Sequence, residues 1–213
     1  MIKIVVLVEV KDMKKLLGML LLVFVITMGF SGVVSAADSQ SHGKSMKKHH
    51  KYTDQHFIEN MVPHHQAAVN MSNIALTRAE HPEVKYLAKN IKKSQSREIS
   101  EMRYWYKKWY GKDVPRSSMM NKEMKKMVNL SRLESAKPFD KEFIRQMVPH
   151  HQMAVTMARM ALKNAKHPEI RTLAHSIIKS QSVEITEMRY WYKKWYGTNL
   201  PNNQGMRASM MRM

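Results

Sequence analysis

The sequence predicts an all-α fold, a four-helix bundle built from two duplicated helical hairpins. The 213 residues contain only 7 glycines and 7 prolines, and Lys, Met, Ala, Glu and Leu dominate in helical spacing. The hydrophobic content of 44% is ordinary for a globular protein and is enough to build a core. The third and strongest observation is an internal repeat.

Adding 86 to any position between Thr53 and Gly111 reaches its counterpart in the second copy without a gap. Phe57–Met71 matches Phe143–Met157 at 11 of 15 positions, and Met102–Gly111 is identical to Met188–Gly197. A single hairpin cannot bury both of its faces, so two docked copies are expected to share one core. The duplication therefore predicts a bundle with pseudo-twofold symmetry, made of hairpins 53–111 and 139–197. A pair of basic amphipathic helices lying on a membrane is the competing architecture.

Within the first hairpin, Asp54 is a good N-cap residue for the first helix. Pro82 suits the first position of the second helix, and Gly111 can end that helix with a positive φ. The second copy repeats these three signals at Asp140, Pro168 and Gly197.

Residues 1–37 are interpreted as a secretory signal peptide. Three lysines between positions 11 and 15 precede the apolar run Leu16–Phe30, and Ser35–Ala37 offers small residues for cleavage. An uncleaved membrane anchor is the alternative, but the run is shorter than the ~20 residues of a typical spanning helix. We therefore expect a periplasmic or secreted protein with no stable membrane insertion after cleavage.

Three further segments flank the repeats. Residues 38–52 are polar and aperiodic, which predicts a disordered His/Lys/Met arm that either binds metal loosely or is simply solvated. Residues 112–138 form a linker in which Met120, Met124, Met127 and Leu130 predict a short Met-rich helix. Residues 198–213 are expected to be an unstructured Met-rich tail.

The formal net charge of +19 raises nucleic acid or another anionic polymer as a partner. Export weighs against nucleic acid, and we expect none, although a basic envelope module that binds anionic polymer or nucleic acid remains the alternative function. The chain has no cysteine, so the fold must hold without disulfides. Any site for a soft metal must then use methionine.

The motif Met-Val-Pro-His-His-Gln occurs at 61–66 and again at 147–152. On a helix, Met61, His64 and Met71 share the stripe that should face the core, with His65 beside it. The partner helix has an apolar seam interrupted by a polar notch, Gln95 and Glu98, followed by Met102. A buried amide and carboxylate need partners, and the His pair is the matching polar level.

Methionine at helical spacing is more often flexible core filler than ligand, and a buried histidine can be satisfied by Glu98 or a carbonyl. The joint occurrence in both copies favours a metal site. Thioethers select Cu(I) and should also hold Ag(I), while imidazole tolerates Cu(I) and Cu(II). A buried dication would need Glu98 or Glu184 to compensate its charge. The Glu-x-x-His pairs of a di-iron centre are absent from both repeats.

Pro63 and Pro149 directly precede the His pairs. Either they kink a continuous helix and open it at the site, or the main helix begins at the proline after a separate short helix. The aromatic runs 104–110 and 190–196 either stack on single-stranded bases or cap the bundle, and we favour capping.

On these motifs the chain resembles the domain-of-unknown-function 305 family of exported proteins, which includes CopM-type copper-binding proteins. The resemblance rests on Phe57, the 61–66 motif, Met71 and the Gln95–Met102 pattern, with the same pattern in the second copy, and it covers about 53–111 and 139–197. It implies a ferritin-like four-helix bundle that binds or confers tolerance to copper, and silver as well. It carries over as metal ligands Met61, His64, His65, Met71, Met102, Met147, His150, His151, Met157 and Met188.

Together these observations predict an exported copper-binding protein that acts in metal sequestration, resistance or transfer through Met/His sites. We expect binding rather than catalysis, because the sequence has no recognisable substrate pocket or acid–base pair. A copper efflux or delivery protein is the expected protein partner.

Overall fold

The computed structural model describes residues 40–116 and 127–201, with side chains from Asp54 onward. The signal segment, Met120 and Met124 of the linker, and all but the first residues of the Met-rich tail lie outside the described residues. The helices are α1 (Gln40–Arg78), α2 (Pro82–Tyr110), α4 (Leu130–Ser135), α5 (Phe139–Asn164) and α6 (Pro168–Tyr196). The described ranges contain no strand, so the all-α class is confirmed. The more specific expectation, that the fold is a ferritin-like four-helix bundle, stays a prediction.

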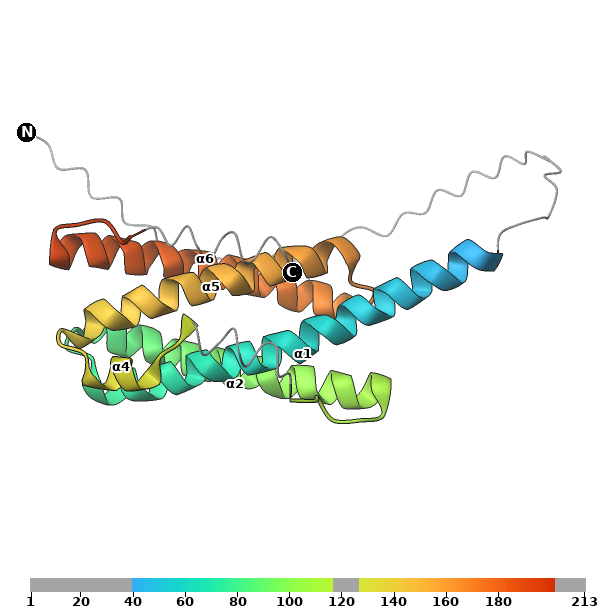
Figure 1. The fold of residues 1–213 in the computed structure, drawn as a ribbon, viewed down its shortest axis with the longest axis horizontal. Coiled ribbons are helices and arrows are strands. Elements are labelled where there is room, and N and C mark those ends of the chain that lie inside the picture. Colours follow the sequence, from blue (N-terminus) through green and yellow to red (C-terminus); the bar gives the residue numbers. More distant parts are fainter. Residues whose placement is uncertain (1–39, 117–126, 202–213) are drawn as a thin grey trace, which may run out of the picture. The chain divides into compact units, whose positions relative to one another are not determined.

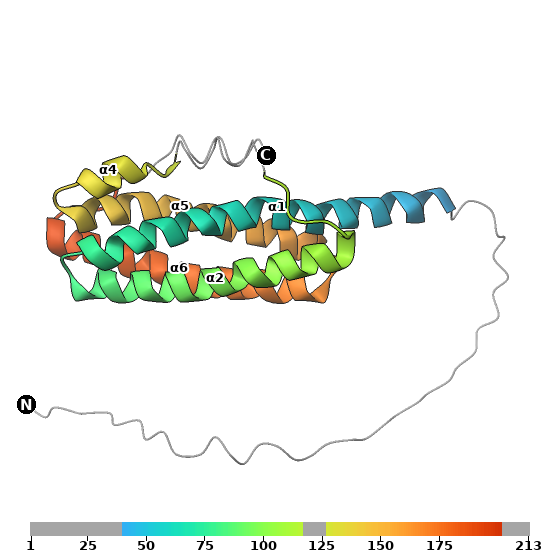
Figure 2. The same cartoon turned by 90° about the horizontal axis from the view of Figure 1, so that it is seen from below.

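The four long helices form two hairpins that meet through their first helices. α1 packs against α2, α5 packs against α6, and the two hairpins contact each other mainly through α1 and α5 (Figures 1 and 2). Both large hydrophobic clusters draw side chains from all four helices. In the first cluster, for example, Ile58 of α1 and Ile99 of α2 are packed with Ala158 of α5 and Ile170 of α6. Neither hairpin therefore has a core of its own.

The predicted ends of the second helices are confirmed. α2 begins at Pro82 and α6 at Pro168. Gly111 and Gly197 adopt left-handed backbone conformations with φ of 70° and 71°, and each donates its N–H to the carbonyl four residues back. Glycine adopts this conformation without the Cβ clash that other residues suffer.

Asp54 and Asp140 were expected to cap the helices that begin near them, and this prediction was wrong. α1 begins at Gln40, so Asp54 lies inside it, and Pro138 occupies the N-cap position of α5. Helix α1 thus takes in most of the segment 38–52 that its composition predicted to be disordered. Extending an existing helix by one residue needs no new nucleus, which explains why a polar Lys- and Gln-containing segment can continue it.

Both aspartates instead fasten the turn of the opposite hairpin. The buried carboxylate of Asp140 accepts hydrogen bonds from the backbone N–H groups of Glu80 and His81, and from His81 Nδ1 at 2.6 Å. Asp54 binds Lys166 and His167 in the same way. Each carboxylate therefore satisfies N–H groups that precede the first turn of α2 or α6. N-cap rules describe local sequence and could not show this exchange between repeats.

The aromatic runs 104–110 and 190–196 cap the bundle, which is the alternative that the sequence favoured. The ring of Trp195 stacks on His81 and that of Trp109 stacks on His167, in both cases with ring centroids 3.7 Å apart. Each Asp–His–Trp set joins α5 or α1 to the hairpin turn of the other repeat, so the two ends of the bundle are closed by equivalent contacts.

The helices α1 and α5 run without a break through Pro63 and Pro149. The alternative in which a separate short helix ends before each proline is therefore wrong. In the linker, α4 begins after Asn129, whose side chain accepts a hydrogen bond from Arg132 N–H and caps the helix.

Asp140→Ala should lower the free energy of unfolding by about 2–3 kcal/mol, because two backbone N–H groups and the His81 ring lose a buried charged acceptor. Urea unfolding followed by circular dichroism measures the change. Asp113→Ala, which removes an exposed carboxylate paired with Lys107, should cost less than about 1 kcal/mol. Equal costs for the two variants would contradict the fastening role of Asp140.

Candidate metal centre

The two His-His pairs meet where α1 crosses α5. All four imidazoles are fully buried. His64 Nε2–H donates to the backbone carbonyl of His150 at 3.1 Å, and His150 Nε2–H donates to the carbonyl of His64 at the same distance. Their ring centroids are 3.7 Å apart. Because the two bonds are reciprocal, a pseudo-twofold axis of the bundle passes between these rings.

The second histidine of each pair is held by the predicted polar notch. His65 Nε2 lies 2.6 Å from Glu98 Oε2, and His151 Nε2 lies 2.6 Å from Glu184 Oε2. A carboxylate or carbonyl can only accept here, so all four rings carry their proton on Nε2. The expected juxtaposition of the His pair with Glu98, and of its copy with Glu184, is confirmed.

In a neutral ring, this proton placement leaves a lone pair on Nδ1. Within the described residues, none of the four Nδ1 atoms has a hydrogen-bond partner, although all are buried. An unpaired buried polar atom is costly. A carboxylate or carbonyl on one imidazole nitrogen is also the arrangement that orients the other nitrogen toward a metal. The residues present therefore fit metal ligation.

Burial is the largest cause that lowers the pKa of His64 and His150 well below the usual value of 6.5. Repulsion from the neighbouring imidazoles adds to the shift, with His150 the main contributor for His64 and His151 for His150. Both rings consequently remain neutral in solutions well below pH 7. A neutral ring keeps its Nδ1 lone pair available for a cation.

Among the ten residues predicted as ligands, nine have fully buried side chains in the described part of the chain, and Met157 is half-buried. Met61 and Met102 belong to one hydrophobic cluster with Met157. Met71 belongs to the other cluster, with Met147 and Met188. Each hydrophobic cluster therefore contains a set of three methionines, two from one hairpin and one from the other. We call each of these sets a thioether group.

The sequence placed Met102 in one site with Met61, His64, His65 and Met71, but Met71 lies in a different hydrophobic cluster from Met61 and Met102. Met71 follows Met61 by ten residues, which is about 15 Å along a helix. The face of the helix is shared, but the level along its axis is not. Because the hairpins are related by the axis at His64 and His150, Met71 lies at the level of the second repeat's methionines and Met157 at that of the first.

The reciprocal bonding of His64 and His150 was not foreseen from the sequence. The signal that could have suggested it is the central place of the His pair in a repeat without gaps, since central residues of a symmetric duplication meet at its axis. The buried Oε1 atoms of Gln95 and Gln181 also have no hydrogen-bond partner among the described residues. They add a neutral oxygen donor to the same polar level.

In the described ranges, no three or more His, Asp or Glu side chains are grouped so as to hold a metal ion. A hard dication that requires several carboxylates thus finds no suitable set there. The donors that are present, imidazole Nδ1 and methionine sulfur, are neutral and mostly soft. This donor set suits a soft, singly charged cation.

The fold and these residues define a duplicated helical-hairpin protein with a buried Met/His centre. The chain belongs to the family described as Domain of unknown function (DUF305), whose pattern matches residues 54–192 and 140–213.

Several solved structures are similar to this chain. CopM in its Cu(I)-bound form is 50% identical with a TM-score of 0.62, over 67% of this chain and 97% of that one. CopM has also been solved in Cu(II)-bound and Ag-bound forms, with 49% and 50% identity. A DUF305 protein from Streptomyces coelicolor is 24% identical with a TM-score of 0.61, over 71% of this chain and 98% of that one, which shows the fold alone.

A curated relative, Uncharacterized protein L153 of Acanthamoeba polyphaga mimivirus, is 47% identical over 49 residues. The match spans 23% of this chain and 32% of that protein. Across residues 40–116 and 127–201, no helix combines the length and the apolar character needed to cross a bilayer.

The stability of the metal-free protein should fall as the pH is lowered below 6.5. The folded state holds His64 and His150 neutral, whereas the unfolded chain takes up a proton on each ring below its ordinary pKa of 6.5. Each ring therefore lowers the free energy of unfolding by up to about 1.4 kcal/mol per pH unit, until the pH reaches its folded pKa. Above pH 6.5 this contribution to stability is fully present.

Urea titrations in the presence of a chelator between pH 5 and 8 measure this slope. The variant His64→Gln/His150→Gln should show a flatter dependence, and His175→Gln, which alters an exposed ring, should follow the wild type. An unchanged slope in the double variant would rule out the two buried rings as its source.

Proposed function

We propose that this protein binds copper, as Cu(I) and Cu(II), and Ag(I), and that it sequesters or transfers the metal at the cell envelope. The observation that carries the proposal is the buried His-His centre, in which four Nδ1 atoms lack a partner among the described residues. Each of the two large hydrophobic clusters of the same bundle contains three methionines. The protein would carry the metal ion, and we propose that it binds the ion without catalysing a reaction.

Ligand chemistry supports a soft ion. Methionine sulfur prefers Cu(I) among the biological first-row metals, and Ag(I) is softer still. Because imidazole and thioether are neutral, a buried monovalent ion leaves only one charge to compensate. Glu98 and Glu184 provide that compensation through His65 and His151. Cu(II), which accepts imidazole more readily than thioether, would rely on the histidines.

Similarity to CopM supports the same metals. Its structures contain Cu(I), Cu(II) or Ag, and the similarity covers nearly the whole of CopM. We extend the proposal to the ferritin-like relation of the bundle, to export through residues 1–37 into the periplasm or medium, and to hand-over with a copper efflux or delivery protein.

Competition for Cu(I) with a chromophoric chelator under anaerobic conditions tests the proposal. The variant His65→Gln/Met102→Leu/His151→Gln/Met188→Leu should bind at least ~100-fold more weakly, which corresponds to about 2.7 kcal/mol. The Met→Leu changes conserve volume and should leave the core packed. Circular dichroism checks that the variant is folded.

His175→Gln/Met160→Leu is the matched control, because it changes the same residue types at exposed positions. It should compete as well as the wild type. Failure of the wild type to remove Cu(I) from the chelator, or equal competition by the centre variant, would refute copper binding at these residues. Affinity for an anionic polymer that falls steeply with salt and survives loss of the His pairs would then favour the basic envelope module.

A further inference from the structure

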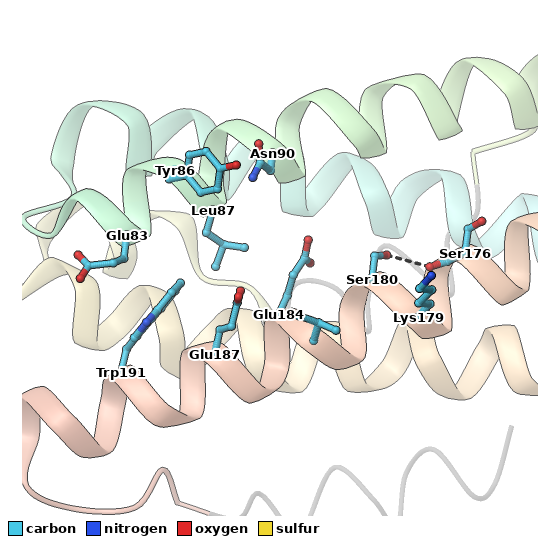
Figure 3. Close-up of a pocket in the computed structure, with 11 residues that line it drawn as sticks. Glu83, Tyr86, Leu87, Asn90, Ser176, Lys179, Ser180, Glu184, Glu187 and Trp191 are labelled. Atoms are coloured by element: carbon cyan, nitrogen blue, oxygen red, sulfur yellow. Dashed lines mark hydrogen bonds between the residues drawn. The ribbon is translucent and has the colours of Figure 1, made fainter. Parts of the chain in front are cut away.

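A groove lies between α2 and α6. It gives the two repeats of the candidate centre unequal access to solvent. It encloses about 520 Å³. Figure 3 shows the carboxylates of Glu184 and Glu187 rising from α6 toward the space that α2 covers from the other side. The residues that line it are Glu83, Tyr86, Leu87, Asn90, Ser176, Lys179, Ser180, Val183, Glu184, Glu187 and Trp191.

The groove reaches the centre through Glu184. One oxygen of this carboxylate accepts the hydrogen bond from His151, and the same side chain lines the groove. His151 is fully buried, and its Nδ1 is without a partner in the part of the chain that the structure describes. Glu184 thus connects the groove to the His151 ring through Nε2, and the unpartnered Nδ1 belongs to the same ring.

The groove lies on one side of the pseudo-twofold axis. Asn90 and Ser176 are counterparts in the repeat, so the axis passes between them on this face. From there the groove extends to Glu83 and Trp191, beside the Glu184 of the second repeat. The side chain of Glu184 is 16% exposed, whereas that of its counterpart Glu98 is 8% exposed. The His65–Glu98 and His151–Glu184 pairs, called here the first and second centres, therefore differ in how far they open to solvent.

Among the residues that line the groove, one differs in formal charge from its counterpart in the other repeat. Val183 lines the groove, and its counterpart in the first repeat is Arg97. Arg97 Nε lies 3.6 Å from Glu101 Oε1, so it partly neutralises the carboxylate that corresponds to Glu187. The groove has three carboxylates against the single Lys179.

A chain with a formal net charge of +19 repels cations as a whole. A cleft with an excess of carboxylates and apolar walls concentrates a cation locally, and such focusing raises association rates by 10–1,000-fold. Leu87, Val183 and Trp191 supply the apolar walls here.

We propose that the α2–α6 groove admits the metal ion to the His151–Glu184 centre, so that the second repeat is loaded before the first. This inference rests on the proposed copper binding. The first repeat, with Arg97 at the matching position, is filled more slowly from the same face.

The test measures the rate of Cu(I) uptake by stopped-flow absorbance in two single-centre proteins. His65→Gln retains the second centre, and His151→Gln retains the first. Uptake by His65→Gln should be about 10-fold faster. Val183→Arg in the His65→Gln protein should remove this advantage, and Arg97→Val in the His151→Gln protein should accelerate uptake.

Controls separate charge from bulk. Val183 and Arg97 are exposed, so the substitutions should leave the fold intact. Val183→Gln adds length without charge and should slow uptake less than Val183→Arg. Ser131→Arg adds the same charge on α4 and should have no effect. The effect of Val183→Arg should shrink at high salt, where surface charges are screened.

Equal rates in the two single-centre proteins, or no change on Val183→Arg, would overturn the proposed route while leaving copper binding intact. An absence of Cu(I) uptake by the wild-type protein would instead overturn the proposed function, and the route with it.

Discussion

The reciprocal hydrogen bonds between His64 and His150 are the constraint on which the rest of the bundle depends. Each neutral imidazole has one N–H and one lone pair, and a buried N–H must find an acceptor. The acceptor that each ring finds is a backbone carbonyl of the opposite hairpin. The contact that joins the hairpins thus also decides which nitrogen is left without a proton. The proton on Nε2 therefore has two consequences: it joins the two hairpins, and it leaves Nδ1 as the candidate ligand atom.

The same exchange between repeats extends outward from the axis. Asp54 and Asp140 satisfy the turn of the other hairpin, and the partly buried Met157 joins a cluster whose other methionines belong to the first repeat. A single hairpin would lose an acceptor for its turn, one thioether of its group and half of its core at once. The pair of repeats is therefore the smallest unit in which both hairpin turns have their carboxylate acceptors and each set of three methionines is complete.

The sequence predicted what depends on local pattern and left open what depends on pairing between the repeats. Helical periodicity and the repeat predicted the hairpins, Gly111 and Gly197 predicted the ends of the second helices, and the polar notch at Glu98 predicted the partner of His65. The role of Asp54 and the grouping of Met71 were not predictable in this way, because both depend on where the axis lies. Side chains on one helical face can be far apart along its length, and only the contact of α1 with α5 fixes the level at which they meet.

Duplication also explains why the two centres have the same types of ligand and still differ in their access to solvent. At the axis, His64 faces its counterpart His150, so a change at either ring alters the packing of both repeats. Exposed positions have no such coupling. Arg97 and Val183 differ in charge without disturbing the core, since each lies at the outer edge of its helix. On the proposed function, divergence at the surface can therefore change the order in which equivalent centres are filled while the ligand set in the interior stays the same.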